Sequence, residues 1–513
     1  MYHTFSVGKT IKMEVKIMKK ERYLALAVSA ALAVSVLGGC GSSENKSEET
    51  KNYDKLLNKD NPTTITIWHY YNGVQLMSFD EAVEEFNNTV GLDKGIIVEA
   101  YSKNSVSELA DSVVASVKKD SGAETPPNIF QTYAETAYVV DELDELADMS
   151  KYLTKDEISE YIDNYITEGE FAGDGSLKIF PTAKSTEVMM LNSTDWQPFA
   201  DATGVTTDDL ATWEGLVEVS KKYYEYTDDL TPDVENDGKA FFGRDSIANY
   251  MSIGAKQLGS EFVKIDSDGK TSAAIDKDAL KKLWENYYVP YVNGYFTAQG
   301  RFRSEDEKTG TIIALICSTT GAMYFPTEVT IDDDNTYPIE HMVLPVPNFE
   351  GTEPYIVQQG AGMSVLKSDE KSEYASSVFL KWFTEKERNI NFSAESGYLP
   401  VKKESCNYSE IEKATERSGT QLSDICKDTL SLAIDEINSY TLYTMPPFKN
   451  SATVRTFLES FIQETAQSAY DEAWDKIKSG SDRDAVIAEY TDDKAFDSWY
   501  DSFCSGLEKA LES

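Results

Sequence analysis

The feature that most constrains the fold is an alternation of short β-branched runs with helical stretches. Residues 65–68 alternate as a strand does, and the stretch that follows carries apolar side chains at three-and-four spacing up to residue 86. A second strand-like run at 96–98, another helical stretch at 109–117 and a third run at 128–131 repeat the pattern. Strands that alternate with helices predict a mostly parallel sheet with helices on both faces, so we expect an α/β fold.

Ligands in such sheets bind beyond the carboxyl ends of the strands. Here these ends are the loops 69–73 and 132–135, and the residues that we expect to contact a ligand there are Trp68, Tyr70, Tyr133 and Glu135. Aromatic rings stack on the C–H faces of polyols, and polar neighbours bind their hydroxyls. The alternative is that these rings pack in the core or against loops, which is about as common at a strand end.

The middle of the chain contains a segment that suits a passage between two lobes. Two extended stretches, 176–180 and 187–191, flank the run 181–186. Further strand-like runs lie at 311–316, 341–347 and 355–358, and the remainder is mainly helical in pattern. No internal repeat is visible, which argues against solenoids and propellers, and 513 residues suffice for two large lobes.

The N-terminal region predicts export and lipidation. Lys19, Lys20 and Arg22 precede an apolar run at 24–37 that is too short to be a permanent membrane span. The run ends in Leu-Gly-Gly-Cys, which resembles the lipobox of bacterial lipoproteins. We therefore expect residues 1–39 to be a signal peptide, Cys40 to be the lipidated first residue and 40–62 to be a flexible tether. The alternative is a short buried helix.

Charge and metal-ligand spacing exclude several classes of function. The net charge is −40, and loss of residues 1–39 removes six basic and two acidic residues and takes it to −44. Binding to nucleic acid as a main activity is therefore excluded. No CxxC zinc pattern is present, and Cys317, Cys406, Cys426 and Cys504 permit three disulfide pairings that the sequence leaves open. We expect no metal and no cofactor.

Two acidic turns resemble known motifs without completing them. Residues 233–238 are similar to the opening of a calcium loop, but Arg244 stands at the twelfth position, where a bidentate glutamate is needed. An Asx-rich turn is the simpler interpretation. Residues 266–269 are best interpreted as a hairpin turn.

Catalytic motifs are absent, so we expect a binding protein rather than an enzyme. No nucleophile elbow, Walker loop, dinucleotide glycine pattern or zinc-protease helix occurs in the sequence. A glycoside hydrolase is the alternative of a different class, because it needs only two suitably separated carboxylates. A surface adhesin is a third.

Four stretches together resemble a known family. They are the strand 65–68 with its helix, the segment 177–192, the run Gln359–Met363 with the helix 374–383, and the Ser-Gly-Tyr-Leu-Pro-Val turn at 396–401. Their order and spacing resemble the extracellular solute-binding proteins of ABC importers for sugars and polyols, which have the type II periplasmic-binding-protein fold. The resemblance implies two lobes with an interlobe cleft, a membrane permease as partner, a lipid-anchored location outside the cell and a monomer. It implies an N-terminal lobe of 63–181 and 346–397 and a C-terminal lobe of 182–345 and 398–513.

The resemblance also implies binding residues. The nearest branch is similar to proteins that bind glycerol 3-phosphate and its diesters, and it adds Ser185, Thr319 with the turn to Gly321, Gly360, Tyr398 and Arg455. Gln359 is a further candidate, because its amide can bind the hydroxyls of a polyol. Two positions depart from that branch, since Ser105 stands where it has a tyrosine and Ala134 where it has a glutamate. These departures favour a sugar or oligosaccharide over glycerol phosphate. Arg455 could still bind a carboxylate or phosphate, although a solvated helix-face charge is the alternative for it.

Overall fold

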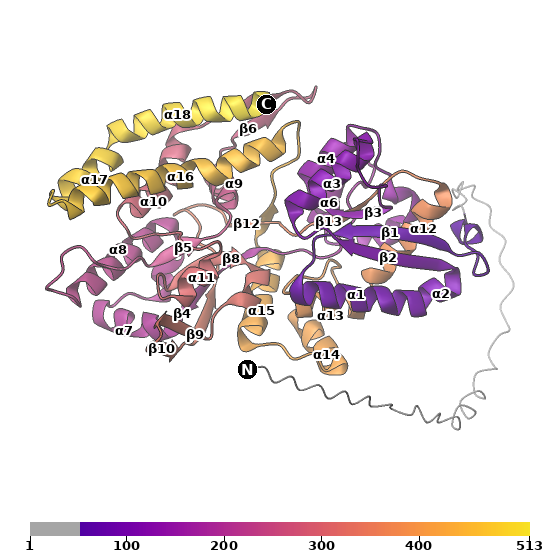
Figure 1. Ribbon diagram of the computed structural model, residues 1–513, viewed down its shortest axis with the longest axis horizontal. Coiled ribbons are helices and arrows are strands. Elements are labelled where there is room, and N and C mark those ends of the chain that lie inside the picture. The colour runs from indigo at the N-terminus through magenta and orange to yellow at the C-terminus, as the bar shows by residue number, and fades with distance from the viewer. Residues whose placement is uncertain (1–51) are drawn as a thin grey trace, which may run out of the picture. The chain divides into compact units, whose positions relative to one another are not determined.

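The computed structural model describes residues 52–513, which form one compact unit (Figure 1). The predicted signal peptide, Cys40 and the first part of the predicted tether lie outside the described residues. Within residues 52–513, no helix combines the length and the apolar character that crossing a membrane requires.

The first sheet is built from the β-branched runs that the sequence predicts. Its strands, in order across the sheet, are β13 (Gly362–Val365), β3 (Ile129–Thr132), β1 (Thr63–His69) and β2 (Ile96–Ser102). β1 pairs in parallel with both β2 and β3, and β13 is antiparallel to β3. Ile65 and Ile67 point into the core and are fully buried, as the alternation predicts. The predicted mostly parallel sheet is therefore confirmed here.

Helices cover this sheet and supply much of its core. They are α1 (Gly73–Asn88), α2 (Val90–Lys94), α3 (Val106–Lys118), α4 (Ala134–Asp141), α5 (Lys155–Ser159), α6 (Asp163–Gly169), α12 (Glu370–Phe383), α13 (Lys386–Ser396) and α14 (Tyr408–Ser418). Phe79 and Phe86 of α1 pack edge-on against Phe379 of α12, with ring centroids 6.3 and 5.2 Å apart. The apolar face predicted for α1 thus lies in the core and contributes through burial of large rings.

The second sheet is mixed rather than parallel. Its strands, in order, are β11 (His341–Leu344), β4 (Glu187–Asn192), β8 (Ala314–Ser318) and β5 (Phe242–Arg244). β4 is antiparallel to both β11 and β8, and only the β5–β8 pair is parallel. β4 is buried along its whole length because it lies between two strands and is covered on both faces.

A second helical layer encloses this sheet. It comprises α7 (Ser193–Thr203), α8 (Trp213–Asp229), α9 (Ile247–Gln257), α10 (Lys277–Val292), α11 (Arg303–Lys308), α16 (Ser451–Lys478), α17 (Arg483–Thr491) and α18 (Asp493–Glu512). α16 packs against α9, α10 and α18 (Figure 1). Two hairpins project from this part, β6 (Val263–Ile265) with β7 (Thr271–Ala273) and β9 (Glu328–Asp332) with β10 (Asn335–Pro338). The first confirms the turn predicted at 266–269.

Three segments cross between the two cores. The first is 181–186, and the second runs from β11 through β12 (Tyr355–Val357) to β13. The third follows β14 (Thr441–Tyr443), which pairs in parallel with β12. Backbone bonds between Ser185 and Gln359, 2.8 and 3.0 Å long, tie the first crossing segment to the second. The chain therefore passes between the cores by strands that are themselves paired.

Residues 398–442, which we expected in the C-terminal lobe, pack largely with the first sheet. Leu399 and Val401 belong to the first core, as do Leu430 and Ile434 of α15 (Asp424–Ser439). The other end of α15 contributes Ile425 and Cys426 to a cluster on the second sheet. α15 therefore has apolar contacts with both cores, because its apolar stripe continues along the whole helix.

The folded unit begins earlier than predicted. The 3-10 turn η1 (Tyr53–Leu56) lies within the stretch expected to be a tether. The ring of Tyr53 packs 4.9 Å from Tyr152 and 5.4 Å from Tyr374, and Asp54 accepts hydrogen bonds from Lys94 and Tyr374. An aromatic side chain within a polar stretch suffices to fold it onto the body.

Candidate functional site

Three of the predicted aromatic residues come together beyond the strands of the first sheet. Tyr70 follows β1, Tyr133 follows β3, and Tyr398 follows α13, and their phenol groups lie close enough to influence one another's pKa. Burial raises the pKa of all three phenols, so each hydroxyl stays protonated and able to donate. The hydroxyl of Tyr70 is enclosed and faces the hydroxyls of Tyr133 and Tyr398.

Tyr71 extends this aromatic group toward the core. Its ring lies 6.1 Å from Tyr70 and 6.4 Å from Tyr398, and its buried hydroxyl lies near Thr182. The aromatic cluster therefore extends from the strand ends into the first core.

Arg455 approaches the tyrosines from the second core. It lies on the second turn of α16 and donates to Asn249 Oδ1 at 3.0 Å and to Ser246 Oγ at 3.4 Å. Its positive charge opposes the effect of burial on the pKa of Tyr133, which places the guanidinium near that phenol. No carboxylate within residues 52–513 forms an ion pair with Arg455, so most of its five N–H donors are available.

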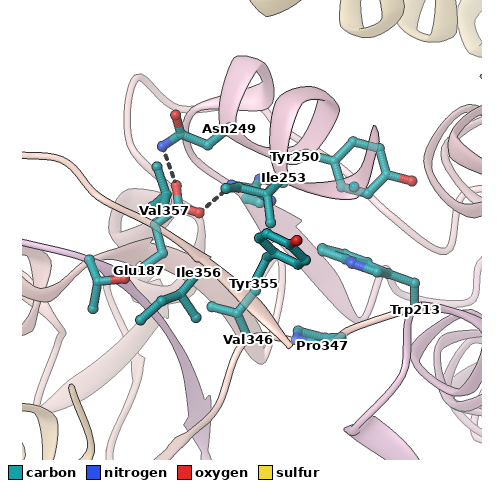
Figure 2. A pocket seen from close by; sticks show the side chains of 13 residues that line it. Glu187, Trp213, Asn249, Tyr250, Ile253, Val346, Pro347, Tyr355, Ile356 and Val357 are labelled. Carbon is teal, nitrogen blue, oxygen red and sulfur yellow. Dashed lines mark hydrogen bonds and ion pairs between the residues drawn. The ribbon is translucent and has the colours of Figure 1, made fainter. Parts of the chain in front are cut away.

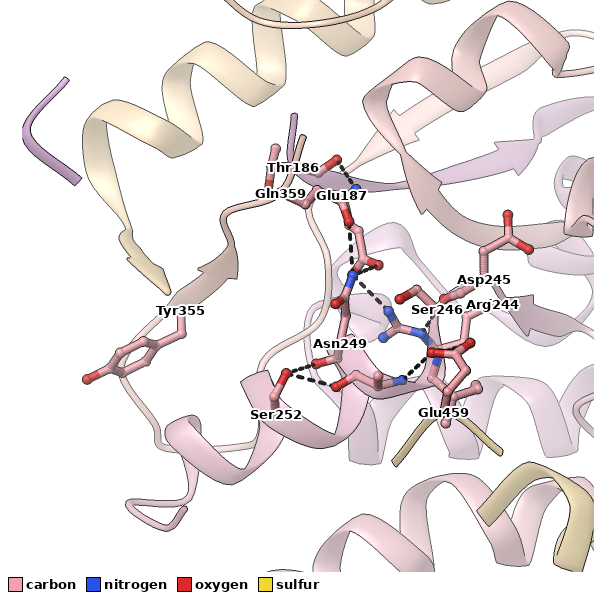
Figure 3. A network of polar contacts seen from close by, with 12 residues as sticks. Thr186, Glu187, Arg244, Asp245, Ser246, Asn249, Ser252, Tyr355, Gln359 and Glu459 are labelled. Atoms are coloured by element: carbon pink, nitrogen blue, oxygen red, sulfur yellow. Dashed lines mark hydrogen bonds and ion pairs between the residues drawn. The ribbon is translucent and has the colours of Figure 1, made fainter. Parts of the chain in front are cut away.

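Gln359 joins the same network through Asn249 (Figure 3). The amide of Asn249 donates to Gln359 Oε1 at 3.0 Å and to Glu187 Oε1 at 2.8 Å. Glu187 also accepts from Arg244 at 2.8 Å, and both side chains of this ion pair are almost fully buried. The structure thus connects predicted residues Gln359 and Arg455 through Asn249, which is held by an ion pair.

The start of α9 is strained at this network. Ser246, which precedes the helix, has a φ of 49°, in the left-handed region that is unusual for a residue other than glycine. Glu459 of α16 accepts hydrogen bonds from the next two backbone N–H groups, at 3.1 and 2.8 Å. Strain of this kind is found at binding sites, where the surroundings hold it in place.

The turn after β8 meets Tyr398. Thr319 is buried, and its N–H donates to the carbonyl of Thr186 at 2.9 Å. A side chain at Gly397 would come within 2.8 Å of the Cα atom of Thr320, so the turn lies directly against the 396–401 segment. Tyr324, at the end of η4 (Thr319–Tyr324), is exposed and raises the pKa of Tyr398 through its own phenol.

Three further predicted residues, Trp68, Ser185 and Glu135, lie around the tyrosines or within the packing of the fold. Trp68 is buried in a cluster with Leu109 and Phe130, and Lys103 Nζ lies 3.9 Å from its ring centre. Ser185 is buried in the first crossing segment. Glu135 lies in the first turn of α4, near enough to influence the pKa of Tyr133.

Gly360 is required by the crossing segments themselves. Its φ is 88°, a Cβ there would lie 2.8 Å from the Cα atom of Lys184, and its carbonyl accepts from Lys184 Nζ at 2.7 Å. Lys184 also pairs with Glu168 at 2.5 Å. Gly360 therefore permits a close approach of two backbones rather than a ligand contact.

Two cavities border the crossing segments. The one in Figure 2 is lined by Arg244, Trp213 and Tyr355 and has a volume of about 10 Å³, enough for a single water and too little for a sugar. A groove of about 480 Å³ lies between Tyr138 of α4 and Tyr443 of β14. Glu168 lines this groove and also influences the pKa of Tyr133, so the groove adjoins the tyrosines.

Sequence reasoning missed Asn249, Ser246 and Tyr324. Their neighbours along the chain carry no motif, and only the pairing of α9 with the second crossing segment brings Asn249 to Gln359. An exposed tyrosine such as Tyr324 has no signal in the sequence that separates it from other surface residues.

The open questions on cysteines and metals are answered only for the described residues. Cys317, Cys406, Cys426 and Cys504 are all free. No group of three or more potential metal ligands occurs within residues 52–513. In the loop that resembles a calcium site, Asp237 accepts a hydrogen bond from Thr231 at 2.6 Å, as in an ordinary polar turn.

Comparisons with known proteins agree with this architecture. The sequence matches the family model of bacterial extracellular solute-binding proteins over residues 81–418. No curated protein matches the chain significantly.

Solved structures of the same fold include three with a bound or named solute. A cyclic α-maltosyl-1,6-maltose binding protein from Arthrobacter globiformis has a TM-score of 0.62 and 18% identity, covering 88% of this chain and 99% of its own. An ABC substrate-binding protein from Listeria monocytogenes in complex with cycloalternan has a TM-score of 0.61 and 16% identity, and the match covers 86% of this chain and 99% of its own. UgpB from Mycobacterium tuberculosis, in complex with glycerophosphocholine, has a TM-score of 0.59 and 16% identity, and the match covers 80% of this chain and 99% of its own.

Two α/β cores joined by paired crossing segments, with tyrosines and an unpaired arginine where they meet, define a binding protein of the periplasmic type. The chain belongs to the bacterial extracellular solute-binding proteins, since the family model matches more than half of its residues. This family is non-catalytic, which confirms the expectation of a binder and corrects the alternative of a glycoside hydrolase.

Proposed function

We propose that the chain captures a sugar or oligosaccharide between its two cores and delivers it to the membrane permease of an ABC importer. The observation that carries the proposal is the arrangement of Tyr70, Tyr133 and Tyr398 on one side and Arg455 with Asn249 on the other. Tyrosine rings stack on sugar C–H faces, and phenol, amide and guanidinium groups bind hydroxyls. The saccharides bound by two of the structural relatives support this class of ligand.

The binding mechanism follows from the crossing segments. We propose that two lobes, one around each core, close on the ligand by a hinge motion. A ligand favours the closed form only as far as it contacts both lobes there, so Tyr133 and Arg455 must both contribute. The phenol hydroxyls of Tyr70 and Tyr133 can bind the hydroxyls of a polyol, which adds to the affinity.

A second candidate ligand is glycerol 3-phosphate or one of its diesters. Arg455 favours it, because its guanidinium has no acidic partner within residues 52–513 although the whole chain carries a net charge of −40. A planar guanidinium binds phosphate through two parallel hydrogen bonds. The relative that holds glycerophosphocholine supports this possibility.

Calorimetry of the folded chain with two probes distinguishes the candidates. The probes are maltotriose and glycerophosphocholine, and the variants are Tyr133→Ala and Arg455→Ala. Arg417→Ala is the matched control, since Arg417 is an exposed arginine paired with Glu387 on α13. A saccharide site predicts that maltotriose binds and that Tyr133→Ala raises its Kd at least about tenfold.

A phosphodiester site predicts a different pattern. Glycerophosphocholine then binds, Arg455→Ala raises its Kd about tenfold or more and Arg417→Ala leaves it unchanged. Absence of binding across a wide panel of sugars, polyols and glycerol phosphates would contradict both candidates.

The proposed location is the outer face of the cell membrane, through a lipid on Cys40. The basic patch, apolar run and Leu-Gly-Gly-Cys sequence support it. A lipid anchor would keep the binding unit near its permease, which raises the effective concentration of the pair.

A further inference from the structure

A groove on the second core, remote from the crossing segments, has the composition of another binding site. It has a volume of about 420 Å³ and lies between the loop 236–240, the turn 294–299 and the end of α16. None of the residues of the proposed interlobe site lines it. Its volume falls within the range of small-molecule sites, roughly 300–1,000 Å³. We refer to it as the lateral groove.

The floor of the lateral groove is a continuous aromatic surface. Tyr470 and Trp474, one turn apart on α16, have ring centroids 5.3 Å apart. Tyr291 lies 6.3 Å from Tyr470, and Tyr224 lies 6.3 Å from Trp474. Tyr470 is only half-buried, so part of its ring faces the groove, whereas Tyr224 and Tyr291 are buried.

Glycine makes room for this floor. Gly294 has a φ of 81°, and a Cβ there would lie 3.0 Å from the ring of Trp474. The hydroxyl of Tyr291 donates to Gln467 Oε1 at 2.5 Å, which fixes the ring below. The aromatic surface is therefore held in place before any ligand binds, which reduces the entropy lost on binding.

The wall opposite the rings is the acidic turn that resembles a calcium loop. Asp228 Oδ1 accepts from the N–H groups of Asp237 and Gly238 at 2.7 and 3.2 Å, and Thr227 Oγ1 accepts from Lys239 at 2.8 Å. The loop backbone is thus bound to the end of α8. These bonds hold the backbone of the loop in place beside the groove, and Thr231 holds the side chain of Asp237 by a hydrogen bond of 2.6 Å.

Four polar side chains that line the lateral groove have no partner in the described part of the chain. The amide groups of Asn236 and Gln299 and the ammonium groups of Lys239 and Lys478 form no hydrogen bond or ion pair within residues 52–513. Amides both donate and accept, as sugar hydroxyls do. Asp237, Lys239 and Lys478 together give the lining a net charge of only one, which favours a neutral ligand.

We propose that the lateral groove binds a neutral saccharide, with a sugar ring stacked on Tyr470 and hydroxyls bound by Gln299 and Asn236. This site is separate from the interlobe site and extends the proposed function to a second, surface-exposed contact with glycans. The combination of a preformed aromatic floor with accessible amides is what points to a sugar, because a sugar ring stacks on an aromatic face while its hydroxyls can replace water on the amides.

Hydrogen–deuterium exchange with maltotriose as the probe locates binding on the folded chain. We expect saturable protection of peptides covering 236–240, 294–299 and 470–478. Gln299→Ala tests the proposal without a risk to folding, because this side chain is exposed. We expect Gln299→Ala to raise the half-saturating concentration at least about threefold and Tyr470→Ala about tenfold.

Tyr500→Ala is the matched control, since Tyr500 is a half-buried ring on α18 that contacts the same core outside the groove. It should change the half-saturating concentration by less than about twofold. Protection that survives both groove variants unchanged, or no protection up to roughly 10 mM maltotriose, would overturn the proposal. Protection of the groove without protection at 184–186 and 355–359 would contradict the interlobe site for this sugar and leave the lateral groove supported.

Discussion

The buried carboxylate of Glu436 makes a quantitative prediction about stability and pH. Glu436 lies on α15, the helix that contacts both cores, and only 3% of its surface is exposed. Neither carboxylate oxygen has a hydrogen-bond partner within residues 52–513. Burial raises the pKa of Glu436 from 4.5 to about 8, so the side chain is protonated in the folded protein at neutral pH.

The sign of the effect follows from proton linkage. Between pH 4.5 and 8 the unfolded chain releases the Glu436 proton whereas the folded chain retains it, so the folded state loses stability as pH rises. Each pH unit well inside this window costs about 1.4 kcal/mol. Between pH 5.5 and 7.5 the loss of stability is about 2.5 kcal/mol. It is slightly less than two full pH units would give, because at pH 5.5 the unfolded side chain is still partly protonated and at pH 7.5 the folded one is partly ionised.

Glu436→Gln removes this titration while it retains the shape of the side chain. We expect the variant to gain about 2.5 kcal/mol over the unmodified chain between pH 5.5 and 7.5. Urea unfolding followed by tryptophan fluorescence at several pH values measures the difference. Glu412→Gln, at an exposed position on α14, is the control, and its stability should fall with rising pH as that of the unmodified chain does. A constant stability difference between Glu436→Gln and the unmodified chain across this range would refute the reasoning.

Three further predictions concern the ion pair, the crossing segments and the anchor. Glu187→Ala leaves the buried Arg244 without its ion-pair partner and should lower the free energy of unfolding, measured in urea, by about 3–5 kcal/mol. Glu387→Ala breaks the exposed pair with Arg417 and should lower it by less than about 1 kcal/mol. Equal losses of stability in the two variants would contradict this reasoning. Gly360→Ala should lower the free energy of unfolding by about 1–3 kcal/mol more than Gly419→Ala does. Both positions have positive φ, but only Gly360 has backbone within 2.8 Å of the new methyl group. Thermal unfolding of the two variants measures the difference, and equal effects would argue against a steric requirement. Cys40→Ser should move the protein from the membrane fraction to the medium, and continued membrane association in cell fractionation would contradict the lipobox interpretation.

The fold class was predictable because local patterns carry it. Residues 65–68 alternate as a strand does, residues 96–98 are a β-branched run typical of a strand, and the apolar spacing of α1 matches one buried helix face. The mixed pairing of the second sheet was not predictable, since strand direction depends on the path of long connections such as that between β8 and β11. Local propensity has no information about that path.

The residues of the candidate site were likewise predictable only in part. The positions of Tyr70 and Tyr133 followed from the rule that binding loops lie at the carboxyl ends of strands, but that rule equally suggested Trp68, which is buried in a core cluster. A strand end has two faces, and a shift of one residue moves a side chain from one face to the other.

The sequence by itself determined the alternation of strands and helices and the acidity, and it predicts an N-terminal export signal, because each depends on the sequence alone and not on contacts between distant residues. Only the tertiary structure decided that Asn249 joins Gln359 to Arg455, that α15 contacts both cores, and that four rings from α8, α10 and α16 form one surface. These contacts join residues far apart in sequence. They depend on how the two cores pack, which a single sequence does not encode in any local pattern.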